Sequence, residues 1–308
     1  MNKKVAVMDL GTNTFHLLIA EGDADHSHTL LKITDPVKLG EGGINKGVIQ
    51  PAAFERGILT MQQFNQHILQ YDVDEVKAIA TSALRSAANG KDFIDEVKAK
   101  TGIVIEIIDG EAEAAYIYKG VKAGGCLSQQ NSLIIDIGGG SVEFILSNAD
   151  TITWKQSFEI GAARLMDKFH QTDPMPVESI NELNTYLEER LVELFTATSQ
   201  HLIKNIIGSS GAFETFAAVI ELQKGNPFDL KKVKSYTFNY ADFLSVTDQL
   251  IHSSHQERVN NKGIIPVRVD MIVVAALFTR FIMKKLDISE VIMSTNSLKE
   301  GVLANMLE

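Results

Sequence analysis

The stretch that most constrains the fold is residues 133–146, LIIDIGGGSVEFIL. Two apolar runs flank three consecutive glycines and a serine, a pattern typical of two β-strands joined by a turn. Pairing across that turn places Asp136 directly opposite Glu143. Like charges opposed across a strand pair are destabilising unless something neutralises them. The stretch therefore predicts a hairpin that carries two carboxylates at its mouth.

A divalent cation and a phosphate group suit this arrangement. Hard cations such as Mg²⁺ bind through one or two carboxylates together with phosphate oxygens of a substrate. Glycine has no Cβ, so successive backbone N–H groups can turn inward and hold an anion. The candidate metal ligands are Asp136 and Glu143, and the candidate phosphate-binding residues are Gly138, Gly139, Gly140 and Ser141.

A second copy of the pattern lies at residues 5–20, VAVMDLGTNTFHLLIA. It places an aspartate, a glycine and a hydroxyl residue in the same register, at Asp9, Gly11 and Thr14. A duplicated strand–turn–strand unit, one copy near the start of each half, indicates two related domains. The alternative, that each aspartate only stabilises its own glycine turn, accounts for either copy alone. The shared register favours two hairpins that grip a phosphate chain across a cleft.

Length and composition predict a globular protein of about two domains, at roughly 150 residues a domain. The chain has 308 residues, of which 45% are hydrophobic and 22% are charged. Its single cysteine, Cys126, excludes an internal disulfide and a cysteine-based zinc cluster. No apolar run reaches the roughly 18 residues of a membrane span, and the first strand begins almost at once after Met1. We expect a cytoplasmic protein without a signal peptide or a membrane partner.

The formal net charge is −10, from 29 lysines and arginines and 39 aspartates and glutamates. Duplex nucleic acid is normally held by basic surfaces that neutralise many phosphates, so we expect no nucleic-acid partner. A polyanionic ligand would need its charge met locally. A metal ion, backbone amides and a few cationic side chains inside a cleft would do this.

Arg85 and Glu113 follow predicted strands at the edge where α/β folds bind ligands. Arg85 lies at the start of a helix after the strand over residues 73–80, and its planar group matches two phosphate oxygens. A solvated surface arginine is the alternative. Glu113 lies in the first turn of a helix and has Ile117, not a cation, four residues further on. An unpartnered carboxylate near a cleft is a candidate general base, although a favourable interaction with the helix dipole explains an acidic residue there equally well.

Ser209, Ser210 and Gly211 lie between a short predicted strand and a helix over residues 212–222. The N-terminus of a helix presents free N–H groups to anions, so these residues are further phosphate-binding candidates. A glycine that simply makes a tight turn is the alternative.

The remaining pattern predicts more helices in the second half. A long core-facing helix is expected over residues 177–202, another over residues 271–286, and a terminal helix after a strand over residues 291–294. His252, His255 and Arg258 sit in a polar stretch, and we expect the two histidines to be solvated. The apolar faces of the long helices suit either the core or a homodimer.

Taken together, eight blocks of the chain resemble, in order, the exopolyphosphatase and guanosine pentaphosphate phosphohydrolase (Ppx/GppA) family. The blocks are VAVMDLGTNTFHLLIAEG, AIATSALRSAANG, IEIIDGEAEAAYIYKGV, LIIDIGGGSVEFIL, SFEIGAARL, IGSSGAFETFAAV, RVDMIVVAAL and VIMSTNSLKEGVL. That family belongs to the actin-like superfamily. The resemblance implies an α/β fold of two actin-like (ribonuclease H-like) domains, each a mixed sheet flanked by helices, with a cleft between them. The expected domains are residues 1–124 and 125–295, with the helix over 296–308 returning to the first.

The resemblance also implies roles for individual residues. Glu113 would be the catalytic base that orients the attacking water, and Arg85 would contact the terminal phosphate. Asp9, Asp136 and Glu143 would lie on the side of a metal ion, Mg²⁺ or Mn²⁺. The implied phosphate-binding residues are Asn13, Thr14, Gly138, Gly139, Gly140, Ser141, Ser209, Ser210 and Gly211.

Ala112 stands where many relatives have a further glutamate, which leaves Glu111 and Glu113 as the choices for the base. Alignment through the following aromatic residue and glycine favours Glu113.

The implied activity is hydrolysis of a terminal phosphoanhydride in polyphosphate or guanosine pentaphosphate. We expect the chain to lack the extra C-terminal helical domain of many relatives, which would leave the preference between the two substrates open. It has no GxxxxGK[ST] sequence, so a P-loop mechanism is not indicated. A kinase of the actin-like type and a non-catalytic nucleotide or polyphosphate sensor are the alternatives.

Overall fold

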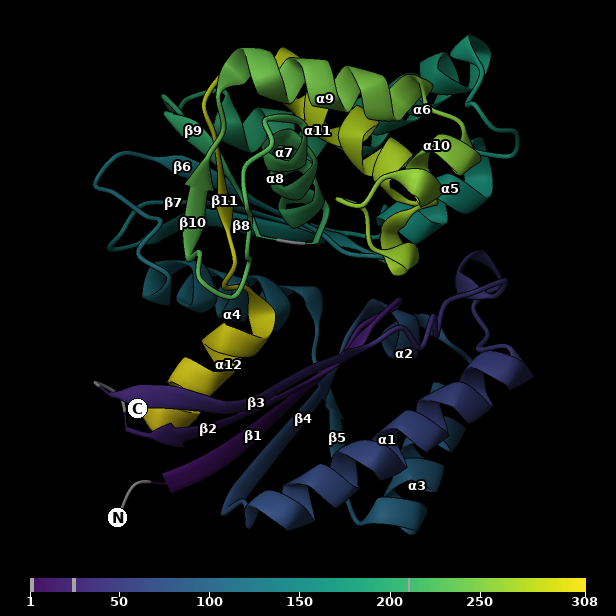
Figure 1. Cartoon of the computed structure of the whole chain (residues 1–308), viewed down its shortest axis with the longest axis vertical. Coiled ribbons are helices and arrows are strands. Elements are labelled where there is room, and N and C mark those ends of the chain that lie inside the picture. Colours follow the sequence, from purple (N-terminus) through teal and green to yellow (C-terminus); the bar gives the residue numbers. More distant parts are fainter. Residues whose placement is uncertain (1–2, 24–25, 210) are drawn as a thin grey trace.

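The computed structural model describes residues 3–23, 26–209 and 211–308. Two mixed β-sheets, each covered by helices, make up the two halves of the molecule (Figure 1). The expected α/β architecture of two mixed-sheet domains is confirmed. Within the described residues, no helix is long and apolar enough to cross a bilayer.

The sheet of the first half has the strand order β3-β2-β1-β4-β5, antiparallel across β3, β2 and β1 and parallel across β1, β4 and β5. Its strands are β1 (Lys3–Leu10), β2 (Phe15–Gly22), β3 (Ser27–Asp35), β4 (Glu75–Ala80) and β5 (Ile105–Ile107). Helices α1 (Pro51–Tyr71) and α3 (Gly90–Thr101) pack on one face. The short segments η1 (Ile44–Lys46) and α2 (Ser82–Ser86) lie toward the second half.

The sheet of the second half repeats this order as β8-β7-β6-β9-β11, with the same change from antiparallel to parallel. Its strands are β6 (Ser132–Ile137), β7 (Val142–Ser147), β8 (Ile152–Phe158), β9 (Asn205–Gly208) and β11 (Val291–Ser294), with β10 (Ser235–Thr237) added antiparallel at one edge. A shared strand order over five strands supports the duplication inferred from the two hairpin sequences.

Helices of the second half cover the outer face of this sheet. They are α5 (Ala162–Phe169), α6 (Val177–Arg190), α7 (Val192–Thr198), α8 (Gly211–Gln223), α9 (Tyr240–His252), α10 (His255–Asn260), η2 (Pro266–Arg268) and α11 (Ile272–Leu286). The long helix expected over residues 177–202 is instead two helices, because Leu191 leaves the helical conformation at φ −106° and ψ 18°. Leu183, Leu187 and Leu194 are fully buried, so the apolar face of this pair is used by the core.

The polar stretch around His252 and His255 also contains a buried arginine. His252 and His255 are exposed, as expected, but residues 255–260 form α10 and Arg258 is 1% exposed. Its guanidinium pairs with Asp173 and donates from Nε to the Val269 carbonyl at 2.8 Å. Arg258 is a structural residue of the second half.

Two helices form a layer between the sheets, α4 (Gly110–Ala123) and α12 (Leu298–Leu307) (Figure 1). One apolar cluster joins residues of α4 and α12 to the inner faces of both sheets. Its buried members are Val7, Leu18, Ile79, Ile108, Ala114, Ile117, Tyr118, Val121, Ile134, Ile145, Ile207, Leu298 and Val302. The terminal helix therefore returns to the first sheet and also meets the second. The predicted boundary between residues 124 and 125 falls in the link from α4 to β6, and it stays a prediction.

The two middle helices cross at glycines. A Cβ added at Gly301 of α12 would lie 1.8 Å from the carbonyl oxygen of Tyr116 in α4. A Cβ added at Gly120 of α4 would lie 2.0 Å from the carbonyl oxygen of Ser297, which precedes α12. Backbones this close leave no room for any other residue at either position.

Candidate active site

Both predicted hairpins form. In the later one, Asp136 of β6 pairs with Glu143 of β7, the register predicted from the sequence. In the earlier one, Asp9 of β1 pairs with His16 of β2. Both turns lie at the end of their sheet that faces the other half of the molecule.

The later turn is held by the start of α5. Three successive backbone N–H groups, of residues 161–163, donate to the carbonyl oxygens of residues 138–140 at 2.8 to 3.2 Å. In a planar trans peptide the N–H points away from the C=O. The N–H groups of residues 139–141 therefore point away from α5. Because these residues line a cavity, the turn presents a row of donors suited to an anion.

The earlier turn is held in the same way by the loop after β3. The carbonyl oxygens of Thr12 and Asn13 accept from the N–H groups of Gly40 at 3.0 Å and Lys38 at 2.7 Å. The N–H groups of Asn13 and Thr14 consequently face the opposite direction. The two turns also touch, because a Cβ at Gly139 would lie 2.4 Å from Asn13 Nδ2.

One cavity of about 330 Å³ lies where the turns meet. Eleven of the candidate residues line it, namely Asp9, Asn13, Thr14, Glu113, Asp136, Gly138, Gly139, Gly140, Ser141, Ser209 and Gly211. Arg85 and Glu143 do not line the cavity and lie behind its wall. Ser210 falls outside the described residues.

Four carboxylates surround the cavity. Those of Asp9, Glu113 and Glu143 are buried, and that of Asp136 is half-buried. Burial is the main cause that raises the pKa of each. It raises the pKa of Asp9 to about 6, that of Glu143 to about 7 and that of Asp136 to about 8. Repulsion by Glu143 further raises the pKa of Asp136, and burial together with Glu143 raises that of Glu113 well above its usual range. A cation bound in the cavity would favour the ionised forms of these carboxylates.

The donor set fits a metal ion that also binds the substrate. Within the described residues, no three acidic, histidine or cysteine side chains are close enough to enclose a metal by themselves. Mg²⁺ needs only one or two carboxylates when phosphate oxygens and water complete its coordination. Asp9 and Asp136 line the cavity beside both turns and are the residues that would hold it, with Glu143 behind them.

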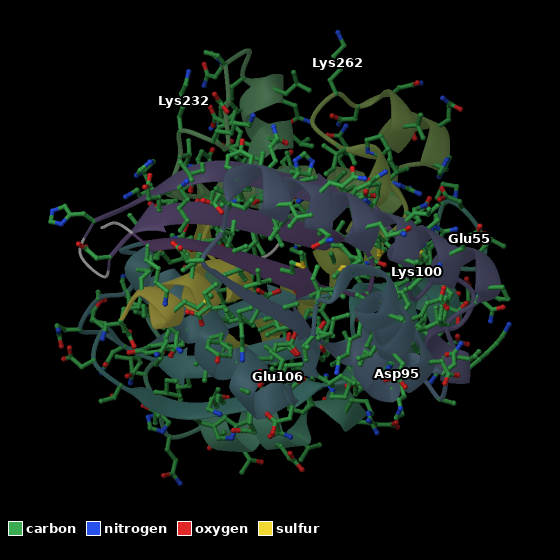
Figure 2. All side chains as sticks on the ribbon, turned by 90° about the horizontal axis from the view of Figure 1, so that it is seen from below. Glu55, Asp95, Lys100, Glu106, Lys232 and Lys262 are labelled. Carbon is green, nitrogen blue, oxygen red and sulfur yellow. The ribbon has the colours of Figure 1, made fainter. Side chains whose placement is uncertain are left out.

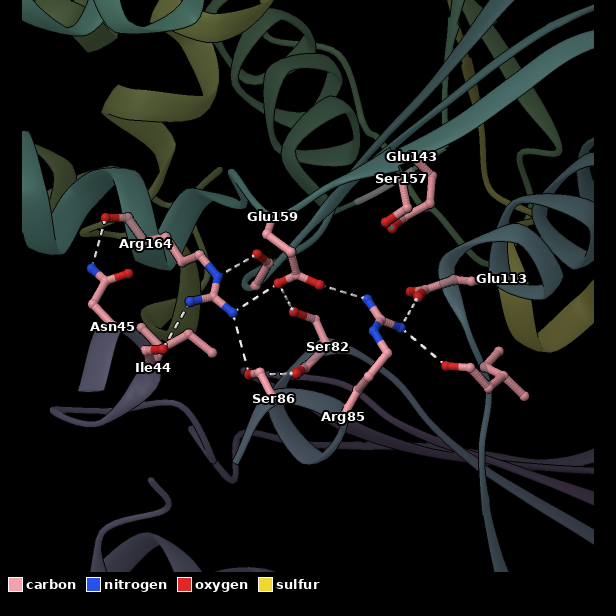
Figure 3. A network of polar contacts seen from close by, with 12 residues as sticks. Ile44, Asn45, Ser82, Arg85, Ser86, Glu113, Glu143, Ser157, Glu159 and Arg164 are labelled. Atoms are coloured by element: carbon pink, nitrogen blue, oxygen red, sulfur yellow. Dashed lines mark hydrogen bonds and ion pairs between the residues drawn. The ribbon is translucent and has the colours of Figure 1, made fainter. Parts of the chain in front are cut away.

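The position of Glu113 corrects one step of the sequence reasoning. Glu113 does have a cationic partner, from another helix: Nη1 of Arg85 in α2 donates to its Oε2 at 3.1 Å (Figure 3). The same Nη1 donates to the Ile108 carbonyl oxygen at 3.0 Å, and Nη2 donates to Glu159 at 2.9 Å. Glu113 is 6% exposed and faces the cavity, so its place in the site does not depend on lacking a partner.

A cationic wall of the cavity was missed from the sequence. Lys32, Arg268 and Lys299 line it. Burial lowers the pKa of Lys299, but Glu300, Asp9 and Glu214 raise it beyond its usual value, so the lysine stays charged. His16 also lines this wall, and burial followed by these three cations lowers its pKa well below the usual range, so it stays neutral. Lys299 lies in the block VIMSTNSLKEGVL, where a lysine at the start of a helix after a strand was the available signal.

Comparison with known proteins identifies the group to which this architecture belongs. The model of the Ppx/GppA phosphatase family matches residues 18–308. The crystal structure of an exopolyphosphatase from Cytophaga hutchinsonii is 41% identical, with a TM-score of 0.96 over 99% of this chain and 98% of that one. A Ppx/GppA enzyme from Aquifex aeolicus is 25% identical, with a TM-score of 0.81 over 99% of this chain and 100% of that one.

Curated relatives agree. A Haemophilus influenzae protein, provisionally named an exopolyphosphatase, is 25% identical over 99% of this chain and 91% of its own length. A Fusobacterium nucleatum protein named as a bifunctional 3-dehydroquinate synthase and phosphatase is 29% identical over 98% of this chain but only 46% of its own length. Because the family model matches nearly the whole chain, over residues 18–308, the chain belongs to the Ppx/GppA phosphatase family.

Proposed function

We propose that this protein is a metal-dependent phosphoanhydride hydrolase that releases terminal orthophosphate from inorganic polyphosphate. Conversion of guanosine pentaphosphate to tetraphosphate is the second substrate reaction to test. The observation that carries the proposal is one cavity in which two rows of backbone N–H donors face the carboxylates of Asp9, Glu113 and Asp136 together with Lys299. Polyphosphate comes first because the similar proteins from Cytophaga and Haemophilus carry exopolyphosphatase names.

In this mechanism the two turns bind the terminal phosphate through residues 12–14 and 138–141. Their donors are fixed before substrate arrives, so they stabilise charge on the phosphate oxygens with little reorganisation. Glu113, with its raised pKa, accepts a proton from a water molecule and orients the oxygen of that water toward phosphorus. A bound Mg²⁺ would neutralise the charge that develops on the transferred group. Arg85, which lies behind the wall of the cavity, holds Glu113 in place.

The test of this proposal is release of free phosphate without an acceptor. Polyphosphate, guanosine pentaphosphate and ATP are incubated with the protein, with and without Mg²⁺. We expect phosphate release from polyphosphate that stops when the metal is chelated. Transfer to a sugar or to acetate with negligible hydrolysis would instead identify a kinase.

Glu113→Gln tests the base. We expect the rate to fall about 100-fold or more, because the amide cannot accept the proton, while substrate binding is largely retained. Glu111→Gln is the matched control, since Glu111 lies in the same turn but is exposed and pairs with Lys155. Steady-state kinetics of the two variants check this. A rate unchanged in Glu113→Gln would remove Glu113 from the mechanism, and full binding with no turnover in wild type would indicate a sensor.

A further inference from the structure

Glu159 follows β8 directly and joins the two halves of the molecule beside the cavity. Its Oε2 accepts from Ser82 Oγ at 2.6 Å and from Arg164 Nη2 at 2.7 Å (Figure 3). Its Oε1 accepts from Arg85 Nη2 at 2.9 Å. Ser82 and Arg85 belong to α2 of the first half, whereas Arg164 belongs to α5 of the second. Three donors from both halves of the molecule fix the position of this half-exposed carboxylate, which distinguishes it from a solvated surface charge.

The contact with Glu159 determines how Arg85 meets Glu113. A guanidinium has five N–H donors, and three of those of Arg85 have partners among the described residues. Only one of the three reaches Glu113. Without the negative charge of Glu159, the planar guanidinium would be free to turn and make a two-pronged contact with Glu113, the geometry that arginine and carboxylate prefer. That contact would occupy both the arginine and the base.

Arg164 fixes Glu159 to the phosphate-binding turn. Its Nε donates to the Gly140 carbonyl oxygen at 2.8 Å, and its Nη1 donates to the Ile44 carbonyl oxygen at 2.8 Å. Arg164 therefore contacts the later glycine turn, the backbone of the first half at Ile44, and Glu159 (Figure 3). The position of Glu159 relative to the turn is set by this arginine.

We propose that Glu159 is a positioning residue that holds the Arg85 guanidinium between two carboxylates. It prevents a two-pronged pair with Glu113, so that Glu113 stays available to the water. The inference rests on the proposed function for the roles of Glu113 and Arg85, and it adds a residue that acts only through Arg85.

The test is a double-mutant cycle of Glu159→Gln and Arg85→Lys. Glutamine keeps an acceptor for Ser82 but loses the charge, and lysine cannot form the two-pronged pair. We expect Glu159→Gln alone to lower kcat about ten-fold, since small misplacements of catalytic groups are costly. KM should change less than about three-fold because the backbone turns supply most ground-state binding. Glu159→Asp, which keeps the charge, should restore most of the rate.

In the Arg85→Lys background we expect Glu159→Gln to lower kcat less than about two-fold further. Effects that simply multiply would show that Glu159 does not act through Arg85 and would overturn the inference. Glu111→Gln is the control here too, because it removes the same charge from an exposed pair between α4 and β8.

A crystal structure of Glu159→Gln separates this inference from the proposed function. We expect Arg85 to turn into a two-pronged contact with Glu113. An Arg85 left in its present contacts would overturn the inference whatever the wild type hydrolyses. Absence of phosphate release by the wild-type protein would contradict the proposed function instead.

Discussion

Single residues give the cavity its chemistry, and the sequence revealed them unevenly. Asp136 and Glu143 could be paired from the sequence because a hairpin turn fixes which residues face each other. The contact between Arg85 and Glu113 could not be predicted from the sequence, because the two side chains come from different helices and no local periodicity links them. Lys299 was missed for the same reason: only the packing of α12 brings it within electrostatic reach of Asp9.

Asp136 makes stability depend on pH with a predictable sign. Its pKa is raised to about 8 in the folded protein, against roughly 4 when unfolded. Between these values the folded state binds more protons, so this residue makes the protein less stable as pH rises, and its effect is complete above about pH 8. We expect Asp136→Asn to gain stability relative to wild type by up to roughly 1.4 kcal/mol per pH unit from pH 5 to pH 8.

Denaturant unfolding of both proteins at several pH values measures this difference, and contributions of other groups such as His16 cancel in it. The control is Asp95→Asn, an exposed position on α3 (Figure 2). A difference between Asp136→Asn and wild type that stays flat over this range would contradict the raised pKa.

The apolar pattern located most helices, but it did not mark every boundary between them and it missed a helix whose buried residue is charged. The apolar pattern runs through Leu191 without interruption, so nothing in it marked the break between α6 and α7. Helix α10 was missed because the residue that it buries is Arg258, which a search for apolar periodicity does not count. The terminal helix was predicted correctly, and its capping box of Ser297 and Glu300 fixes where it begins.

Gly301→Ala tests the crossing of α12 and α4. The added methyl group would meet the Tyr116 carbonyl oxygen, so we expect a loss of stability of roughly 1–3 kcal/mol. A shift of α12 would also move Lys299, so activity should fall with stability. Asn305→Ala, at an exposed position of the same helix, should change stability by less than about 0.5 kcal/mol. Thermal and denaturant unfolding compare the two, and an unchanged Gly301→Ala would mean that the helices can separate at little cost.

The molecule as a whole has a negative net charge, whereas one wall of its cavity is lined by cationic side chains. Charged side chains of both signs project from its surface, among them Glu55, Asp95, Lys100, Lys232 and Lys262 (Figure 2). The net charge of −10 opposes a polyanion at long range, whereas Lys32, Arg268 and Lys299 act only within the cavity. The sequence predicted this balance from composition, but the meeting of cations from β3, η2 and α12 required the packed fold.

Salt dependence tests this balance. At fixed Mg²⁺, we expect kcat/KM for polyphosphate to rise as ionic strength increases from low salt, because screening weakens the long-range repulsion between like charges. The rate at saturating substrate should stay constant and serves as the internal control. A kcat/KM that falls steeply with salt would mean that the cationic wall governs the approach of substrate.

The start of α5 has one more consequence. Its first amide groups are already bonded to the later glycine turn, so this helix is a scaffold for the anion site rather than part of it. Moving the hairpin alone into another protein would leave its peptide planes free to rotate. A transplant of the phosphate grip therefore needs the two segments together, although some twenty residues separate them in the chain.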